Sequence, residues 1–330
     1  MNPKFKKLFI TGGAGYVGAC LVPKLLEAGY QVTVFDLMIY GQDVLSDHPN
    51  LTKVRGDIRD INAMEQHICS SDAVIHLACI SNDPSFELNP SLGKSINLDS
   101  FEPLVQLSRN SGVKRFIYAS SSSVYGVKKE SKVTEELSLE PLTDYSKFKA
   151  ECEVILQRYS DDSFTTVTLR PATVCGYSPR QRLDVVVNIL TNLAYHKRMM
   201  TVFGGDQLRP NIHISDMVDA YLKILDCTDE EVNGEIFNVG SQNHSVNELA
   251  QIVREIVGID VEISSEISND NRSYHISSDK IQSKIGFSSQ LSVKQASQEL
   301  VSAFENGKLT DPLDNPLYFN IKMMQKINLR

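Results

Sequence analysis

The sequence has no concentration of positive charge, no paired cysteines and no long apolar run. Its 33 lysine and arginine residues against 41 acidic residues leave a net charge of −8, without a basic tail or cluster, so nucleic acid is not an expected partner. The six cysteines are scattered without a Cys-x-x-Cys pair, which predicts reduced, mostly buried packing residues and no metal site. No segment is long and apolar enough to span a bilayer, so no membrane contact is expected.

The first residues also lack the features of a secretory signal. The positive charges at 4–7 run straight into an apolar strand-like stretch, with neither an extended apolar core nor a small-residue cleavage site. We therefore expect a cytoplasmic protein. A length of 330 residues with 42% hydrophobic composition suits one large domain or two associated domains, and no internal repeat or low-complexity linker divides them.

A glycine-rich turn at 12–18 is the strongest local signal in the chain. An apolar run enters it and a helical pattern leaves it, and Gly12, Gly15 and Gly18 fit both GxxGxxG and GxGxxG. Without side chains, the amide groups at the start of the helix are open to a diphosphate. The turn alone would be weak support, because glycine-rich turns are common.

An acidic residue at the end of the next predicted strand, 30–36, strengthens this interpretation. Asp36 lies about twenty residues past the turn, where its carboxylate can accept both ribose hydroxyls of NAD and repel the 2′-phosphate of NADP. Strand, turn, helix, strand and acid in this order predict an NAD site. Asp57 lies in the exit of a third strand, the strand and its exit together being 51–58. The sequence leaves open whether Asp57 accepts from the adenine amino group or caps the following helix.

Strands and helices alternate through the first half of the chain. We expect strands at 73–78, 115–120 and 165–171 and helices at 61–68 and 96–111. This alternation predicts an α/β fold of the Rossmann type, a doubly wound parallel sheet that binds ligands beyond the carboxyl ends of its strands. His76 lies inside an apolar strand and is assigned no role, because a lone histidine there is usually a core residue.

Hydroxyl groups and a tyrosine–lysine pair follow the fifth predicted strand. The serines at 120–123 form either a polar loop or a set of hydroxyls that meet substrate. Tyr145 and Lys149 are four residues apart on one face of a predicted helix, which Thr143 or Asp144 would cap. A tyrosine phenol has a pKa of about 10, and a neighbouring ammonium together with a positive nicotinamide would lower it. After a dinucleotide signature, this common spacing predicts a catalytic pair.

These motifs occur in the same order in one known family. Four further segments match the same family in the same order: Gly56-Asp57-Ile58, His76-Leu77-Ala78, Asn97 and the Val-Tyr-Gly that ends the serine loop. Over nearly its full length the chain resembles the extended short-chain dehydrogenases/reductases, of the NAD-dependent nucleotide-sugar epimerase/dehydratase type, and is UDP-glucose 4-epimerase-like. The resemblance implies NAD as cofactor, a nucleotide-diphosphate sugar as substrate, and a homodimer formed by helices near 98–111 and 146–159.

The resemblance also implies roles for individual residues. Tyr145 would take a proton from a sugar hydroxyl, Lys149 would bind the nicotinamide ribose and lower the pKa of Tyr145, and Ser121 would hydrogen-bond the same sugar oxygen. The cofactor contacts that it implies are Gly12, Gly15, Tyr16, Val17, Gly18, Asp36, Asp57, Ile58, Ala78, Asn97, Tyr145, Lys149 and Pro171.

Two serines separate this chain from other branches of that family. Dehydratases resemble one another in carrying Asp-Glu directly after the catalytic Ser/Thr, and decarboxylases usually carry Glu at the second position; here these are Ser122 and Ser123. A hydroxyl does not replace a carboxylate as general base without a partner. We therefore expect inversion at C4 through a 4-keto intermediate, with a C4 dehydrogenase/reductase as the alternative. A 4,6-dehydratase and a non-catalytic NAD-sensing relative are less favoured.

The second half is predicted to form a smaller substrate domain, 171–330, after an NAD-binding domain, 1–170, to which the chain returns near 211–240. The 4-epimerases usually carry Asn shortly after the strand at 165–171, but Ala172 and Thr173 stand here. The polar loop 172–184 looks more like that of a bacterial branch acting on modified sugars. We expect phosphate contacts to shift to Arg180 and Asn188, although a solvated loop would also explain the arginines at 180 and 182.

Two later segments complete the expected substrate site. Arg209 begins an Arg-x-x-x-His-x-x-Asp segment and is the candidate for the nucleotide diphosphate, with His213 structural and Asp216 capping a helix at 217–225. Arg272 is either a phosphate ligand or an exposed arginine, and the tail from Asp311 gives no signal. The expected substrate contacts are Ser122, Ser123, Arg180, Asn188, Arg209 and Arg272.

Overall fold

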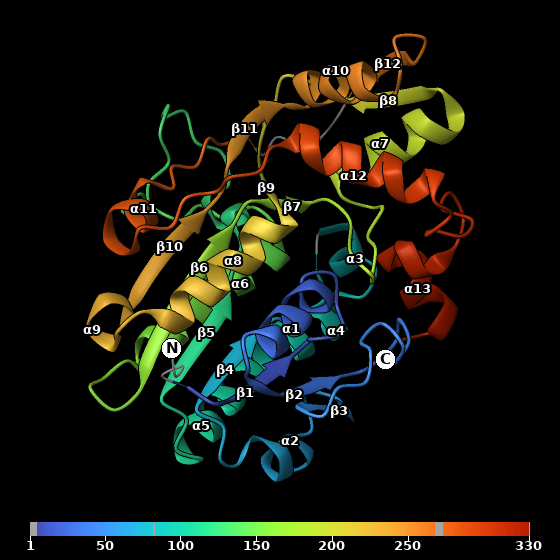
Figure 1. The fold of residues 1–330 in the computed structure, drawn as a ribbon. Coiled ribbons are helices and arrows are strands. Elements are labelled where there is room, and N and C mark those ends of the chain that lie inside the picture. Colours follow the sequence, from blue (N-terminus) through green and yellow to red (C-terminus); the bar gives the residue numbers. More distant parts are fainter. Residues whose placement is uncertain (1–4, 82, 268–272, 330) are drawn as a thin grey trace.

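A parallel sheet with helices on both faces forms the larger part of the molecule (Figure 1). The computed structural model describes residues 5–81, 83–267 and 273–329. The sheet has the strand order β10-β6-β5-β4-β1-β2-β3. Its strands are β1 (Lys7–Thr11), β2 (Gln31–Asp36), β3 (Leu51–Arg55), β4 (Ala73–His76), β5 (Arg115–Ala119), β6 (Thr165–Pro171) and β10 (Glu235–Val239). The predicted Rossmann-type α/β fold is confirmed.

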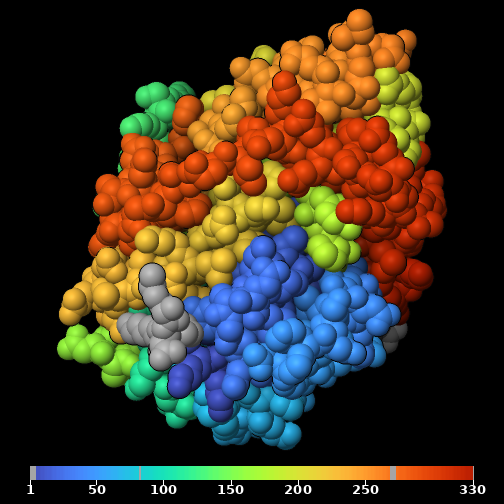
Figure 2. Space-filling model, in the orientation of Figure 1, coloured from blue at the N-terminus to red at the C-terminus, as the bar shows by residue number. Residues whose placement is uncertain are grey.

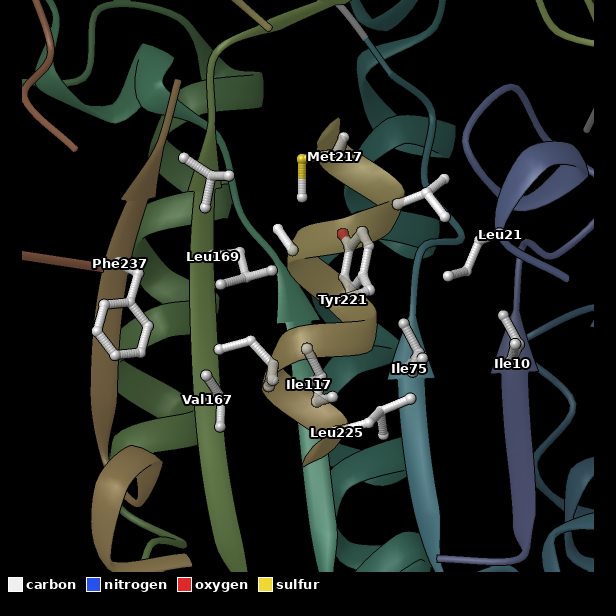
Figure 3. Packing of buried hydrophobic residues seen from close by; sticks show 14 of the residues in the cluster. Ile10, Leu21, Ile75, Ile117, Val167, Leu169, Met217, Tyr221, Leu225 and Phe237 are labelled. Atoms are coloured by element: carbon white, nitrogen blue, oxygen red, sulfur yellow. The ribbon is translucent and has the colours of Figure 1, made fainter. Parts of the chain in front are cut away.

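Each face of this sheet is covered by helices with an apolar stripe. One face carries α1 (Gly18–Glu27), α8 (Ile214–Asp226) and α11 (Asp279–Ile285); the other carries α2 (Ile61–Ile68), α5 (Phe101–Asn110) and α6 (Asp144–Gln157). In Figure 3, Met217, Tyr221 and Leu225 of α8 follow one another at one-turn spacing over the side chains of the sheet. Burial of this stripe fixes which way α8 faces.

The order of the strands reverses at β1, which lies between β2 and β4. Thr11, the last residue of β1, pairs with Phe35 on one side and with His76 on the other. Chain connections diverge from this point, so a crevice opens beyond the carboxyl ends of the three strands. The residues that follow β1, β2 and β4 therefore lie at one edge of the sheet.

A second lobe packs beyond that edge. It contains β7 (Thr173–Cys175), β9 (Leu208–His213) and β11 (Gln242–Ser245) in one sheet, β8 (Met199–Phe203) and β12 (Glu262–Glu266) in another, and the helices α7 (Val186–Lys197), α10 (Val246–Val257) and α12 (Val293–Glu305). Val187, Leu190, Leu249 and Val253 form its core. After β7, β8 and β9 in the second lobe, the chain returns to the large sheet, where α8 packs on one face and β10 is the edge strand. It then enters the second lobe again with β11 and α10.

Short elements complete the described chain. They are α3 (Asp83–Glu87), α4 (Pro90–Lys94), the π-helix η1 (Ser95–Asp99), the 3₁₀-helices η2 (Ser122–Tyr125) and η3 (Pro316–Tyr318), α9 (Asp229–Val232) and α13 (Asn320–Ile327). Figure 2 shows the C-terminal segment, in red, on the same face as the blue segment that follows β2. The Tyr40 hydroxyl donates to Asn320 Oδ1 at 2.9 Å, which joins the two.

The helix caps correct one expectation and resolve two others. His213, not Asp216, caps α8, because its ring accepts the Ser215 N–H, whereas Asp216 accepts the N–H groups of residues 290 and 291. Thr143 caps α6 in a capping box. Asp60, rather than Asp57, caps α2. The domain division at 170/171 remains a prediction.

Within the described residues, no helix is both long enough and apolar enough to cross a membrane. The six cysteines are free: Cys69 is exposed, Cys20 and Cys79 are half-buried, and those at 152, 175 and 227 are buried.

His76 lies in the core of the large sheet. It hydrogen-bonds Thr11 through Nδ1 at 2.7 Å and stacks on Tyr118, with ring centroids 5.9 Å apart. Burial, with a smaller contribution from the positive charge of Lys149, lowers the pKa of His76 to about 3. It therefore stays neutral in the folded protein, in agreement with a structural role.

The pH dependence of stability should report this neutral histidine. In the unfolded chain its pKa is about 6.5, so between pH 6.5 and 3 the unfolded state binds more protons and folding is destabilised as the pH falls. The free energy of unfolding, measured in urea between pH 7 and 5, should fall more steeply in the wild-type protein than in His76→Asn. Equal slopes in the two proteins would contradict the assignment.

Candidate active site

A cavity of about 630 Å³ lies at the carboxyl edge of the large sheet, between it and the second lobe. This volume is in the range of small-molecule sites. One half is lined by residues that follow β1, β2, β3 and β4, and the other by residues of β8 and β9. Of the predicted site residues, those in it are Gly12, Gly15, Tyr16, Val17, Gly18, Asp36, Asp57, Ile58, Ala78, Ser121, Ser122, Ser123, Tyr145, Lys149, Pro171, Arg180 and Arg209.

The glycine turn fits a diphosphate because no side chain can occupy it. Gly12 has φ +74°, and a Cβ there would lie 2.5 Å from the backbone nitrogen of Ala78. At Gly18, where α1 begins, a Cβ would lie 2.4 Å from the carbonyl oxygen of Gly13. The turn therefore packs backbone against backbone and leaves the start of α1 uncovered by side chains, as a dinucleotide requires.

Asp36 is held in place at the end of β2. Its two carboxylate oxygens accept the backbone N–H of Ala14 at 3.0 Å and of Met38 at 2.8 Å. Burial raises the pKa of this carboxyl, while the two hydrogen bonds and the positive charge of Arg180 act against the rise. The carboxylate thus ties the glycine turn to the segment after β2 and borders the cavity at the same time.

Asp57 borders the cavity beside Ile58 without capping a helix. It accepts from the side chain and the backbone N–H of Arg59, with Arg59 Nη2 at 2.6 Å. Burial opposes ionisation, but the hydrogen bonds and charge of Arg59 outweigh it and lower the pKa of Asp57. The adenine-side position, one of the two alternatives left open by the sequence, remains compatible with this geometry.

The predicted catalytic side chains meet in the centre of the cavity. Tyr145 and Lys149 come from the first turns of α6, and Ser121 precedes η2. The Lys149 ammonium donates to the Ala119 carbonyl at 2.6 Å and lies 5.9 Å from the centre of the Tyr145 ring. Ser121 accepts the Ser123 N–H at 3.1 Å and hydrogen-bonds the phenol of Tyr145. One hydroxyl and one ammonium thus flank the phenol.

The pKa of Tyr145 differs from the sequence expectation in this structure. Burial raises it well above the ordinary value, helped by the charges of Cys79 and Asp83, while Arg182 and the Ser121 hydrogen bond act in the opposite direction. The protein itself therefore holds Tyr145 as a neutral phenol. Arg182 is a cationic influence on it that the sequence did not indicate.

The second lobe lines the other half of the cavity. Arg209 of β9 lies there with Thr201 and Phe203 of β8. Ser122 and Ser123 lie in the large-sheet half and are buried, and the hydroxyl of Ser123 is 2.9 Å from that of Ser121. Arg272 lies outside the described residues.

Two asparagines expected at the site do not line the cavity. Asn97 turns its amide to Ile80, donating to the carbonyl at 2.9 Å and accepting the N–H at 2.8 Å, so it orders the loop after β4. Asn188 of α7 is fully buried; its amide donates to the Arg182 carbonyl and the Tyr16 hydroxyl and accepts the Gly176 N–H. Neither amide lines the cavity, so the contacts of Asn97 with the cofactor and of Asn188 with a phosphate stay predictions that this geometry does not support.

Several cavity residues were not predicted. They are Tyr40, Ser81, Asp83, Asp184, Asn320, Met324 and Leu329. The tail that gave no signal supplies the last three of these. Apolar residues at 321, 324 and 327 have helical spacing and could have predicted α13, but not where it packs.

A buried polar network packs against the segments that carry Ser121, Tyr145 and Lys149. Glu153, one turn after Lys149 on α6, accepts from the Ser120 hydroxyl and pairs with Arg170 at 2.7 Å. Arg170 donates to the Tyr125 hydroxyl at 2.7 Å, which in turn donates to Asn238 of β10 at 2.7 Å. The network fixes the serine loop, α6 and two strands relative to one another.

No group of three or more histidine, cysteine or acidic side chains that could hold a metal ion occurs within residues 5–81, 83–267 and 273–329.

Comparison with known proteins identifies the family. The model of the NAD dependent epimerase/dehydratase family matches residues 8–240. UDP-glucose 4-epimerase of Lactobacillus helveticus is 27% identical over 275 residues, covering 77% of this chain and 83% of the relative. The structure of UDP-glucose 4-epimerase from Thermotoga maritima with UDP-glucose has a TM-score of 0.84 and 26% identity, covering 92% of this chain and 100% of that chain. The chain spans 60% of the length of an uncharacterised protein from Sinorhizobium fredii, to which it is 32% identical.

Proposed function

Because this chain belongs to the NAD-dependent epimerase/dehydratase family, whose cofactor is NAD, we propose that it is a nucleotide-sugar epimerase that inverts C4 of the sugar. The observation that carries the proposal is the meeting of Ser121, Tyr145 and Lys149 in a cavity whose serine loop presents hydroxyls at 122 and 123. Bound NAD supplies the acceptor, and later the donor, of a hydride.

The chain's own residues would move the proton and hold the sugar. With cofactor bound, the Lys149 ammonium and the positive nicotinamide would favour loss of the Tyr145 phenol proton to solvent. The phenolate then takes the proton of the C4 hydroxyl as the sugar is oxidised and returns it when the ketone is reduced on the other face. Ser121 orients the same oxygen, and Lys149 holds a positive charge beside the phenol. Burial, which raises the pKa of Tyr145, also excludes water from the reacting centre.

The other half of the cavity would bind the nucleotide. Arg209 offers a guanidinium for a diphosphate, and the apolar side chain of Phe203 on β8 also lines the cavity. The diphosphate would lie there, and the sugar would extend toward Tyr145.

A 4,6-dehydratase is the second candidate, because a carboxylate lies in the same cavity. Asp83 accepts from the Thr143 hydroxyl and is close enough to raise the pKa of Tyr145. A carboxylate near the reacting sugar is what removal of water needs. The position differs from that of Ser122 and Ser123, where dehydratases carry their acid and base.

The experiment that tests the function is a panel of UDP-, GDP-, CDP- and dTDP-sugars, with products identified by NMR. Epimerisation gives a sugar inverted at C4 with no net reduction of nicotinamide. Loss of water to a 4-keto-6-deoxy sugar would replace this function by the dehydratase. A keto sugar accumulating with stoichiometric reduced nicotinamide would establish a C4 dehydrogenase instead.

A homodimer through α5 and α6 also remains a proposal. It is supported by Val154 of α6, an apolar side chain that is 53% exposed on the surface of the chain.

A further inference from the structure

The loop between β7 and α7 lies across the glycine turn. This arginine strap, residues 176–184, is fixed to the turn at Tyr16, whose hydroxyl donates to the Gly176 carbonyl at 2.7 Å and whose own carbonyl accepts the Ser178 hydroxyl at 2.8 Å. Asn188 anchors the strap from the other side. A segment outside the large sheet therefore covers the place where a dinucleotide would lie.

Two buried arginines of the strap have unused hydrogen-bond donors. Arg180 is 4% exposed and Arg182 is 9% exposed, and both line the cavity. Within the described chain, Nε and Nη1 of Arg180 and Nη2 of Arg182 have no hydrogen-bond partner. A buried, partly unpaired guanidinium is unfavourable unless an anion completes it. Arg182 is already paired with Asp184, Nε to Oδ1 at 2.8 Å, so the uncompensated charge of the strap is that of Arg180. The unused donors of both side chains indicate an anionic ligand.

The C-terminal segment closes this site from outside. Asn320, the first residue of α13, accepts Arg180 Nη2 at 2.6 Å and donates to the Ser81 hydroxyl at 3.0 Å. Its backbone N–H is bound by Asp184 of the strap at 2.9 Å. The strap, the loop after β4 and the tail are thus joined at one residue.

The position of Arg180 distinguishes between two possible diphosphates. The Arg180 guanidinium stacks on Tyr40, with Cζ 3.5 Å from the ring centre. Its positive charge also acts to lower the pKa of Asp36, which precedes Tyr40 by four residues. Both residues follow β2, in the half of the cavity built on the large sheet. Arg209, by contrast, comes from the second lobe and lines the other half.

We propose that Arg180 and Arg182 bind the diphosphate of the dinucleotide cofactor, and that the strap and α13 together retain it between turnovers. The glycine turn meets the diphosphate from the sheet side, and the arginines meet it from the opposite side. Release then requires the strap to leave Tyr16 and Asn320 to leave Arg180. This inference depends on the family's cofactor and not on which sugar carbon reacts.

Cofactor retention after gel filtration tests the proposal without turnover. Wild-type protein should keep NAD, quantified after acid release, whereas Arg180→Gln should bind NAD about ten- to a hundredfold more weakly and lose it on the column. Asn320→Ala leaves both arginines in place, so folding is less at risk, and it should release NAD faster than the wild type. Circular dichroism establishes that each variant is folded.

The matched control is Arg209→Gln, with UDP as the probe of the other half of the cavity. It should retain NAD and bind UDP more weakly, whereas Arg180→Gln should leave UDP affinity unchanged. The proposal is overturned if Arg180→Gln keeps NAD as tightly as the wild type and instead loses affinity for UDP, because the arginines then serve the sugar nucleotide. Failure of the epimerase proposal would leave these binding results unchanged.

Discussion

Replacing Tyr145 by phenylalanine should lower turnover of a nucleotide sugar by about a hundred- to ten-thousandfold and leave NAD bound. The substitution removes only the hydroxyl that carries the proton. The ring keeps its edge contact with Phe86, whose centroid is 6.5 Å away, and its buried place on α6. Initial rates with the substrate found in the sugar panel, together with NAD content, give the two quantities needed.

A second tyrosine provides the matched control for this substitution. Tyr159 lies just beyond the end of α6, and its hydroxyl donates to Glu102 at 2.8 Å, away from the residues that line the cavity. Tyr159→Phe should therefore leave turnover unchanged. Turnover of Tyr145→Phe within tenfold of the wild type would exclude the phenol as the proton-transferring group.

Replacing Glu153 by glutamine should lower the free energy of unfolding by about 3–5 kcal/mol. The side chains of Glu153 and Arg170 are 4% and 3% exposed, so the substitution leaves a buried guanidinium without its counter-charge. It also weakens the bond to the Ser120 hydroxyl, next to Ser121, the serine that we propose orients the sugar oxygen. Urea unfolding, with reversibility checked, measures the loss.

Two comparisons separate the charge effect from packing. The double variant with Glu153→Leu and Arg170→Met removes both charges and should lose less stability than Glu153→Gln alone. Glu27→Gln breaks the exposed pair with Lys24 and should change stability little, because solvent screens that pair. A loss in Glu153→Gln no larger than in Glu27→Gln would show that the network does not stabilise the fold.

The large-sheet half of the site was predictable because its signals are local. Gly12 and Gly18 are only six residues apart, and Asp36 ends the next strand. Tyr145 and Lys149 are adjacent on one helix face whatever the helix packs against. Such features depend on backbone periodicity and need no knowledge of distant segments.

The junction at Asn320 was not predictable for the opposite reason. Asn320 meets Tyr40 and Arg180, which lie in different parts of the sequence, and no local pattern relates the three. The same limit applies to Asn97 and Asn188. The sequence shows that each carries an amide, but whether that amide faces the cavity depends on tertiary packing. Burial of Tyr145, which raises the pKa of its phenol, is also a tertiary property.

The place of β10 in the large sheet has a consequence for synthesis of the chain on a ribosome. β10 pairs with β6 at the edge of the sheet, although the strands β7, β8 and β9 are made between them (Figure 1). At about 5–20 residues per second, the edge of β6 stays open for several seconds, and the sheet face that α8 covers stays exposed for most of that time. An open strand edge is a template for wrong pairing. A chaperone would therefore be most useful after β6 and before β10 have been synthesised, when it would cover the open strand edge and the exposed sheet face.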